Sequence, residues 1–278
     1  MQDSLRLRMP TGIDSLDPML DGGVPPGSAV LLLGEHGAGN IEFVQTSIMH
    51  LSTRKQSGAP GENLLLPGGI SYVTFTRMQE DILREMALSF NQGLYSRLEE
   101  EVVFHDLSKL YFDASIVPPG WYSEGSVIER LQKKQRKENG NILAEVARVL
   151  DGCEKRGLIV LDSLTDIAPP MTDPVRWHAF IAFLRGLQRA AKRWNTTVYL
   201  LLTSGILERS QELEIADCVD ATLLFRWEET GAQRRQRVMH FEKFRGVMPR
   251  LEEKDLVKFA VKISAGSGFE VRNIRVVV

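Results

Sequence analysis

A glycine-rich segment contains the residues with the clearest chemical potential in this chain. It reads Gly34-Glu35-His36-Gly37-Ala38-Gly39-Asn40-Ile41 and lies between an apolar run and a segment with helical spacing. The two outer glycines have the spacing of a phosphate-binding loop, G-x-x-x-x-G-K-[ST], whose backbone N–H groups hold phosphate. The sequence therefore predicts a strand, a glycine turn and a helix N-terminus shaped for an anion.

The two positions that supply chemistry in such a loop are changed. Asn40 stands in place of the lysine, and its neutral amide cannot offset phosphate charge. Ile41 stands in place of the hydroxyl residue and cannot ligate Mg²⁺. Glu42 adds a carboxylate that favours the helix dipole but repels an anion. Because Asn40 is also a good N-cap, we interpret the stretch as a self-capped helix; a turn without ligand and weak nucleotide binding through backbone N–H groups are the two alternatives.

Composition points to an ordinary globular protein. The 278 residues are 43% hydrophobic and 25% charged, with a formal net charge of -2, so no overall basic surface indicates nucleic acid. Cys153 and Cys218 lack metal-ligand partners nearby in the sequence and fit buried roles in a reducing compartment. No apolar run reaches the ~18 residues of a membrane span, and no signal-peptide core is visible. We expect a cytoplasmic protein.

Strand and helix patterns alternate through the first 203 residues, which predicts an α/β fold with a mostly parallel sheet covered on both faces. The last part is rich in strands, which we expect to extend the sheet antiparallel at its C-terminal edge. We expect residues 1–278 to form one domain. Expected strands are 29–33, 70–76, 102–104, 158–161, 197–202, 223–227, 237–244 and 257–263; expected helices are 13–20, 40–54, 79–90, 127–131, 142–153 and 174–194.

Three further segments connect the expected strands and helices or extend from them. The length of segment 106–123 predicts a lid or an interface loop. Its aromatic side chains either pack onto the core or form a partner interface. Residues 205–215 are expected to form a loop. A basic run, 234–237, faces Glu228-Glu229 across an expected hairpin turn at 229–231, which favours cross-strand charge pairing. The aromatics in question are Tyr111, Phe112, Trp121 and Tyr122.

Asp162 is a further candidate site residue. It ends a continuous apolar run typical of a buried parallel strand, at the sheet edge where ligands bind in open α/β folds. A helix N-cap or a structural carboxylate are the alternatives. Thr203-Ser204 closes the next strand, where it forms a turn or contacts a γ-phosphate.

Four segments together resemble KaiC-like proteins of the RecA ATPase superfamily. This resemblance implies a RecA-like P-loop NTPase fold, with ATP as ligand, Mg²⁺ supported by Asp162, and a homo-oligomer. In that family, residues matching Lys243 and Arg245 reach the neighbouring subunit's nucleotide. The matching segments are Thr11–Asp17 with Asp21–Ser28, Tyr72–Phe75, Leu158–Leu164 and Glu242–Gly246.

Within the superfamily, Gly34–Phe43 and Val117–Tyr122 resemble archaeal, HTR-like paralogues with an altered phosphate loop. A more distant likeness is to the archaellum motor-associated ATPase-like protein. KaiC-like ATPases carry a glutamate pair after the second strand to activate water. Here Thr76-Arg77 occupies that position and the first carboxylate is Glu80.

We therefore predict a non-hydrolysing regulatory or assembly module that binds nucleotide weakly or not at all and has no catalytic residues. Its partners would be further copies or another protein. A slow ATPase in signalling or motility and a DNA-associated recombinase paralogue are the alternatives. The predicted nucleotide-site residues are Gly34, Glu35, His36, Gly37, Ala38, Gly39, Asn40, Ile41, Asp162, Lys243 and Arg245.

Overall fold

One nine-stranded sheet organises the computed structural model, which describes residues 7–57, 63–91, 98–113, 115–122, 142–171, 173–230 and 234–274. The strand order is β3-β2-β4-β5-β1-β6-β7-β8-β9. Pairing is parallel from β3 to β6 and antiparallel from β6 to β9, as predicted. The strands are β1 Ala29–Gly34, β2 Ile70–Thr74, β3 Val102–Asp106, β4 Leu158–Asp162, β5 Thr197–Thr203, β6 Ala221–Thr230, β7 Arg234–Phe244, β8 Lys258–Ser264 and β9 Gly268–Asn273.

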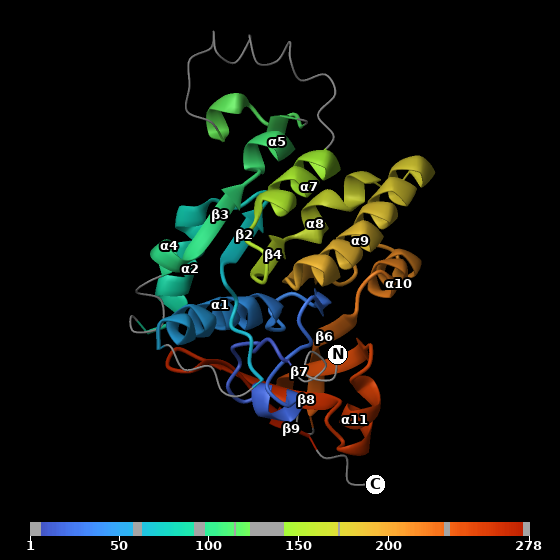
Figure 1. The fold of residues 1–278 in the computed structure, drawn as a ribbon. Helices are drawn as coiled ribbons and strands as arrows, with labels where there is room; N and C mark the ends of the chain where they lie inside the picture. The colour runs from blue at the N-terminus through green and yellow to red at the C-terminus, as the bar shows by residue number, and fades with distance from the viewer. Residues whose placement is uncertain are drawn as a thin grey trace.

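Helices cover both faces of the parallel half of this sheet (Figure 1). The long ones are α1 Asn40–Ser57, α2 Gln79–Ser89, α7 Ile142–Gly152 and α9 Pro174–Trp194. The shorter ones are α4 Leu98–Glu101, α5 Ser108–Asp113, α8 Leu164–Ile167, α10 Arg209–Asp217 and α11 Met248–Glu253, with 3₁₀ turns η1 Asp17–Leu20, η2 Pro119–Trp121 and η3 Pro169–Met171.

The central strand β1 shows why its sequence is apolar throughout. Val30 and Leu32 face the cluster that contains α1 and α2, whereas Leu31 and Leu33 face the cluster that contains α7 to α10. Successive side chains of a strand point to opposite faces, so a strand covered on both sides needs an unbroken apolar run. The glycine turn that follows β1 is thereby fixed at the sheet's carboxyl edge.

The predicted lid at 106–123 is wrong for its first half. Asp106 accepts a hydrogen bond from the Ser108 N–H at 2.7 Å, and α5 begins there. The sequence carries no clear signal for this helix because it is short and its apolar residues, 110–112, are consecutive and show no helical period.

The aromatics of this segment divide between the core and the surface. Tyr111 packs against the core cluster, and the Phe112 ring lies 5.3 Å from that of Tyr122. Trp121 is 80% exposed. Packing onto the core is thus confirmed for Tyr111, and the interface role of Trp121 stays a prediction.

Three smaller expectations are corrected. Residues 205–215 are not all loop, because a capping box of Glu208 and Gln211 starts α10. The expected helix at 13–20 is only the 3₁₀ turn η1. Strand β6 continues through 229 and 230, so the hairpin turns later than predicted. The expected helix at 127–131 lies outside the described residues, and α8, α11 and β9 had no clear sequence signal.

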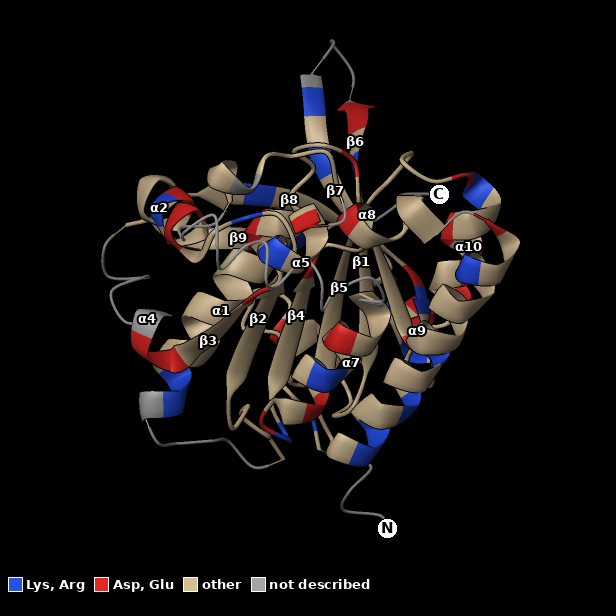
Figure 2. Ribbon diagram, turned by 90° about the horizontal axis from the view of Figure 1, so that it is seen from above, with Lys and Arg blue, Asp and Glu red and all other residues tan. Residues whose placement is uncertain are grey.

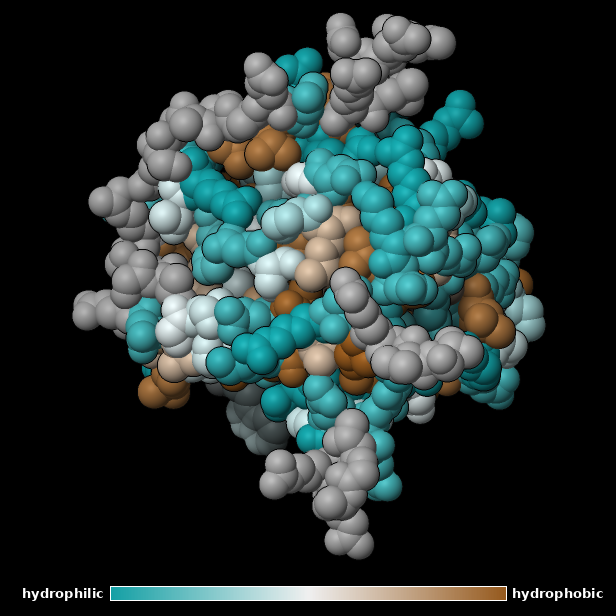
Figure 3. Space-filling view, turned by 90° about the horizontal axis from the view of Figure 1, so that it is seen from below, coloured by the Kyte–Doolittle hydropathy of each residue, from teal (hydrophilic) through white to brown (hydrophobic). Residues whose placement is uncertain are grey.

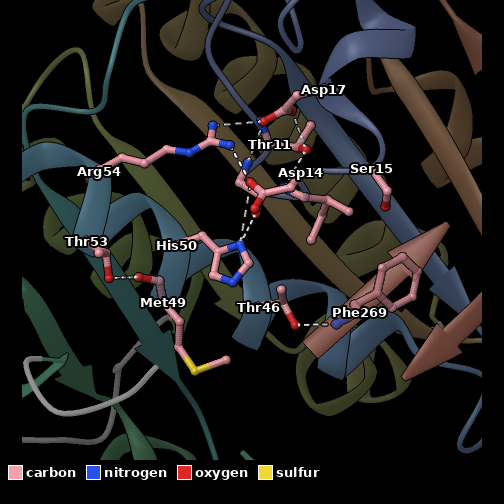
Figure 4. Close-up of polar contacts among 12 residues, drawn as sticks. Thr11, Asp14, Ser15, Asp17, Thr46, Met49, His50, Thr53, Arg54 and Phe269 are labelled. Carbon is pink, nitrogen blue, oxygen red and sulfur yellow. Dashed lines mark hydrogen bonds and ion pairs between the residues drawn. The ribbon is translucent and has the colours of Figure 1, made fainter. Parts of the chain in front are cut away.

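The N-terminal turn is docked on α1 through a polar network (Figure 4). Thr11 donates from its N–H and its hydroxyl to Asp17 Oδ1, at 2.7 and 2.6 Å, and Arg54 of α1 reaches Asp17 Oδ2 at 3.1 Å. His50 Nδ1 lies 2.8 Å from the Gly12 carbonyl oxygen. Burial raises the pKa of Asp17, against the lowering effect of these partners. The Thr11–Asp17 motif therefore fixes α1 in place.

The outer edge of β9 is covered by hydroxyl side chains. The Phe269 N–H donates to Thr46 Oγ1 at 2.8 Å, and the Val271 N–H donates to Ser15 Oγ at 2.8 Å. An unpaired edge strand is a template for aggregation. Thr46 holds β9 against α1 (Figure 4), and Ser15 holds it against the N-terminal segment.

We expect Thr46→Val to lower the free energy of unfolding by about 1–3 kcal/mol, because it leaves the buried Phe269 N–H without an acceptor. Urea unfolding followed by circular dichroism measures the change. Thr53→Val is the matched control, since its hydroxyl bonds only the Met49 carbonyl of its own helix; a change within about 0.5 kcal/mol is expected there. Equal losses in both variants would contradict the role of Thr46.

The surface seen in Figure 3 is largely hydrophilic, with small hydrophobic groups between polar side chains. None of the helices in the described ranges has the length and apolarity needed to cross a bilayer.

Candidate functional site

The turn between β1 and α1 lies at the carboxyl edge of the parallel strands (Figure 1). Gly37 has φ +68° and Gly39 has φ +112°, conformations that favour glycine. A Cβ on Gly39 would lie 3.1 Å from the Phe269 ring and 3.3 Å from Ile263. The glycines therefore allow the turn and its close packing on β8 and β9.

Several N–H groups of this turn point away from secondary-structure partners. The Ala38 N–H donates to the Glu35 carbonyl at 3.0 Å, and the first helical bond runs from Phe43 N–H to the Gly39 carbonyl at 2.9 Å. Within the described chain, the N–H groups of 39–41 have no acceptor among the backbone hydrogen bonds. Unsatisfied N–H groups at a helix N-terminus form a ready anion site.

The prediction that Asn40 is the N-cap of the helix is wrong, because Asn40 is its first residue. Helix α1 begins at Asn40, and Gly39 provides the capping carbonyl. The Asn40 amide folds back over Gly34, where a Cβ would lie 2.5 Å from its Cγ. Residue 40 as a whole is 8% exposed, and its side chain has no hydrogen-bond partner among the described residues. The sequence could not distinguish the two cases, because an asparagine at the N-cap and an asparagine at the first helical residue are both compatible with the same glycine-rich segment.

Ile41 belongs to the apolar core. It is half-buried and packs against the cluster that contains Phe43 and Phe269. The side chain that would be a hydroxyl ligand in a phosphate-binding loop therefore contributes hydrophobic contact, and it offers no atom to a metal.

Asp162 ends β4 and is 7% exposed. Tyr72 donates its hydroxyl to Asp162 Oδ2 at 2.6 Å, and Arg77 Nη1 lies 3.4 Å from the same oxygen. Burial raises the pKa of Asp162, while the Tyr72 hydrogen bond and the Arg77 charge oppose that shift. The candidate Mg²⁺ ligand is thus held by a phenol and a guanidinium.

Arg77 continues this network toward α1. Its guanidinium also pairs with Glu85 of α2, and Gln45 of α1 donates to Glu85 Oε1 at 2.9 Å. The network joins β2, β4, α1 and α2 below the glycine turn. The sequence showed that Arg77 replaces a carboxylate, but the pairing with Asp162 required the fold, because 85 residues separate the two.

Thr76, Thr203 and Ser204 are engaged in structural contacts at the same edge. Thr76 donates to Asp166 at 3.4 Å. The Thr203 N–H donates to Thr165 Oγ1 at 2.8 Å, and the Ser204 N–H donates to the Gly34 carbonyl at 2.9 Å. Residue 204 begins a turn, as predicted.

Lys243 and Arg245 both contact the C-terminus of α10 in their own chain. Lys243 Nζ donates to the Ala216 carbonyl at 2.8 Å, and Arg245 Nη2 donates to the Asp217 carbonyl at 3.0 Å. Burial and the neighbouring Arg245 lower the pKa of Lys243. Cations at a helix C-terminus are stabilising. Strand β7, which carries Lys243, lies between β6 and β8 in the sheet.

The hairpin of β6 and β7 projects beyond the body, with basic residues on β7 and acidic residues near the end of β6 (Figure 2). It contacts the glycine turn directly. The Trp227 N–H donates to Glu35 Oε2 at 2.9 Å, Trp227 Nε1 donates to the His36 carbonyl at 3.1 Å, and Arg237 Nε donates to the Gly37 carbonyl at 2.7 Å. No sequence signal connected this hairpin with residues 35–37, which lie about 190 residues earlier.

A parallel sheet with a glycine turn after its central strand β1, and an aspartate ending β4 on the far side of β5, defines a RecA-like P-loop fold. No family model matches the chain. Over 139 residues it is 31% identical to the circadian clock oscillator protein KaiC of Parasynechococcus marenigrum, covering 47% of this chain and 23% of KaiC. Over 129 residues it is 32% identical to KaiC of Prochlorococcus marinus, covering 45% and 22%. The chain therefore resembles KaiC over just under half of its own length, and the match spans less than a quarter of those relatives.

Solved structures agree on the fold over nearly the whole chain. A KaiC-like protein from the hyperthermophilic archaeon Pyrococcus horikoshii has a TM-score of 0.61 at 19% identity, covering 95% of this chain and 98% of its own. The flagellar accessory protein FlaH from Methanocaldococcus jannaschii has a TM-score of 0.62 at 15% identity, with coverages of 94% and 96%.

The residues present fit the phosphates of ATP better than they fit Mg²⁺. Free N–H groups and the side-chain amide of Asn40 can donate to phosphate oxygens. A magnesium ion needs oxygen ligands in octahedral geometry. Asp162 is already paired with Arg77, and Ile41 offers no oxygen. In the described parts of the chain, no three His, Cys, Asp or Glu side chains gather as a metal site.

Proposed function

We propose that this chain is a non-hydrolysing member of the KaiC-like proteins, which acts by holding phosphate groups weakly and by assembling with further copies or a protein partner. The observation that carries the proposal is the pairing of Asp162 with Arg77 and Tyr72. A carboxylate with a permanent internal cation is a poor metal ligand, because a metal would have to displace a charge-assisted contact.

The position of the general base supports the same conclusion. Thr76 and Arg77 follow β2, and neither side chain accepts a proton from water near neutral pH. Glu80 is exposed in the first turn of α2. Hydrolysis would therefore lack both its metal ligand and its base.

The slow-ATPase alternative has one specific observation in its favour. Asp166 accepts a hydrogen bond from Thr76, so it is a carboxylate at the edge of the site. Its other oxygen accepts from the Ser163 N–H and hydroxyl, at 3.2 and 3.0 Å, in the capping box of α8. That engagement makes it a structural carboxylate in our proposal.

Assembly with further copies would bring Lys243 and Arg245 to a neighbouring subunit. Lys243 and Arg245 reach a neighbour in the family, but here each contacts α10. A trans role would require both side chains to leave these carbonyls. Mass measurement in solution with and without ATP tests whether nucleotide changes the number of copies.

We expect no ATP-dependent phosphate release above that of an Asp162→Asn variant, because the wild-type carboxylate does not support a metal. A sensitive phosphate-release assay with Mg-ATP, run with wild type and with Asp162→Asn, measures this. Asp166→Asn tests the alternative base. Turnover that disappears in Asp162→Asn would overturn the proposal, and turnover that disappears only in Asp166→Asn would establish a slow ATPase with a different base.

A further inference from the structure

The hairpin face that overlies the glycine turn carries two arginines on one aromatic ring. The guanidinium carbons of Arg235 and Arg237 lie 4.8 and 4.4 Å from the Trp227 ring centroid. Trp227 pairs with Arg237 in the β6–β7 register, and Glu229 pairs with Arg235. Side chains two apart on a strand share a face, so both arginines lie on the face that contacts the turn.

The positive charges of these two arginines are not neutralised by an ion pair within the described chain. The predicted cross-strand pairing at this hairpin is wrong in detail, because Glu228 pairs with Lys258 at 2.6 Å and with His240 at 3.2 Å. Glu229 lies opposite Arg235 in the strand register, but among the described residues no carboxylate forms an ion pair with Arg235 or Arg237. Arg237 uses Nε on the Gly37 carbonyl, which leaves its terminal Nη groups as donors.

The turn below them presents donors that lack partners. The N–H groups of 39–41 make no backbone hydrogen bond within the described chain, and Asn40, a residue only 8% exposed, has a side-chain amide without a partner there. The amide lies over Gly34, inside the turn. The amide atoms of Asn40 are not among the fully buried polar atoms without a partner, so they keep contact with solvent and are free to donate to a bound anion.

We propose that Arg237 and Arg235 supply the positive charge that a phosphate-binding loop takes from its lysine, and that the site holds a di- or triphosphate group without Mg²⁺. This inference rests on the proposed function. Guanidinium groups bind phosphate oxygens through charge-assisted hydrogen bonds. The Trp227 ring and the Gly37 carbonyl orient Arg237 toward the turn from a strand of the same chain.

The metal-free character follows from the charges around the turn. Asp162 is occupied by Arg77, so the usual metal carboxylate is neutralised. Two guanidiniums can offset phosphate charge in place of the ion. Glu35 and Glu42 oppose binding; the carboxylate of Glu35 is held by the Trp227 N–H, and Glu42 lies in the first turn of α1. These charges limit the affinity.

Isothermal titration calorimetry with ATP and with inorganic tripolyphosphate, in EDTA and again in excess Mg²⁺, tests the inference. We expect binding in EDTA that is at least as tight as in Mg²⁺. Arg237→Gln should weaken it about threefold to tenfold, and Arg235→Gln somewhat less, because each removes one charge-assisted contact. Arg226→Gln is the matched control, since Arg226 lies on the opposite face of β6 and faces Glu242 at 3.9 Å.

The outcomes separate this inference from the proposed function. The inference would be overturned by a requirement for Mg²⁺, by equal effects of Arg226→Gln and Arg237→Gln, or by no binding in EDTA. None of these results bears on the proposed absence of turnover, which the phosphate-release assay tests separately. Similar affinities for ATP and for tripolyphosphate would show that the site recognises the phosphate groups. A single-stranded DNA oligonucleotide that binds more tightly than tripolyphosphate at physiological salt would reassign the surface to nucleic acid.

Discussion

Arg77→Met is expected to lower the free energy of unfolding by about 3 kcal/mol, because it leaves a buried carboxylate without its cation. Asp162 is 7% exposed, and Tyr72 would then be its remaining hydrogen-bond partner within this network. Methionine keeps the apolar stem of the arginine, so the loss reports mainly on the charge. Urea unfolding at neutral pH measures it.

The loss should depend on pH in a defined direction. The pKa of Asp162 is already raised because burial outweighs the opposing effects of Tyr72 and Arg77, and removal of Arg77 raises it further. A carboxyl whose folded pKa exceeds its unfolded pKa binds more protons when folded. The free-energy cost of burying this carboxyl therefore grows as the pH rises from the unfolded pKa through the folded pKa, and acidification removes it. The deficit of Arg77→Met relative to wild type should therefore shrink as the pH is lowered from neutral toward the pKa of the unfolded carboxyl.

Two further variants make the prediction specific. Arg77→Met combined with Asp162→Asn should regain more than half of the lost stability, because the amide is neutral and still accepts from Tyr72. Arg84→Met removes an exposed arginine of α2 that pairs with Asp81 at 3.5 Å, and little change is expected. A pH-independent deficit that the double variant does not relieve would show that Arg77 stabilises by packing alone.

The fold was largely predictable because its apolar patterns are long. Strand β4 and helix α9 have their predicted positions, since an unbroken apolar run and a 21-residue amphipathic period each allow one interpretation. Helix α5 and strand β9 escaped prediction for the opposite reason. Each has about six residues, and their ends are set by tertiary contacts, such as the Thr46 hydroxyl against Phe269.

The site was predictable in its residue types and unpredictable in its partners. The sequence alone identified the replacements at Asn40, Ile41 and Arg77. It did not show that Arg77 lies beside Asp162, or that Trp227 and Arg237 contact the glycine turn. Those pairings join elements far apart in the chain, and only the strand order brings them together.

Asn40→Lys is expected to tighten ATP binding by about 10-fold to 100-fold while leaving turnover absent. A lysine at the start of α1 adds a charge-assisted contact to phosphate oxygens, in a turn whose N–H groups are free. In the proposed function the metal ligand and the base are both missing, so added affinity has no route to hydrolysis. Adding Ile41→Thr restores the hydroxyl, but it also removes apolar contact from the core, so the single variant is the cleaner measurement.

Calorimetry and phosphate release on the same samples distinguish affinity from chemistry. Asn91→Lys is the control for added net charge, because residue 91 is exposed and distant in sequence from the turn. If Asn40→Lys hydrolyses ATP, then a water-activating group exists despite Thr76 and Arg77, and Asp166 is the first residue to substitute. If its affinity equals that of Asn91→Lys, the Asn40 position does not face a phosphate. Tighter binding without turnover would instead mean that this glycine turn retains a phosphate site, and that hydrolysis was lost at Asp162 and after β2.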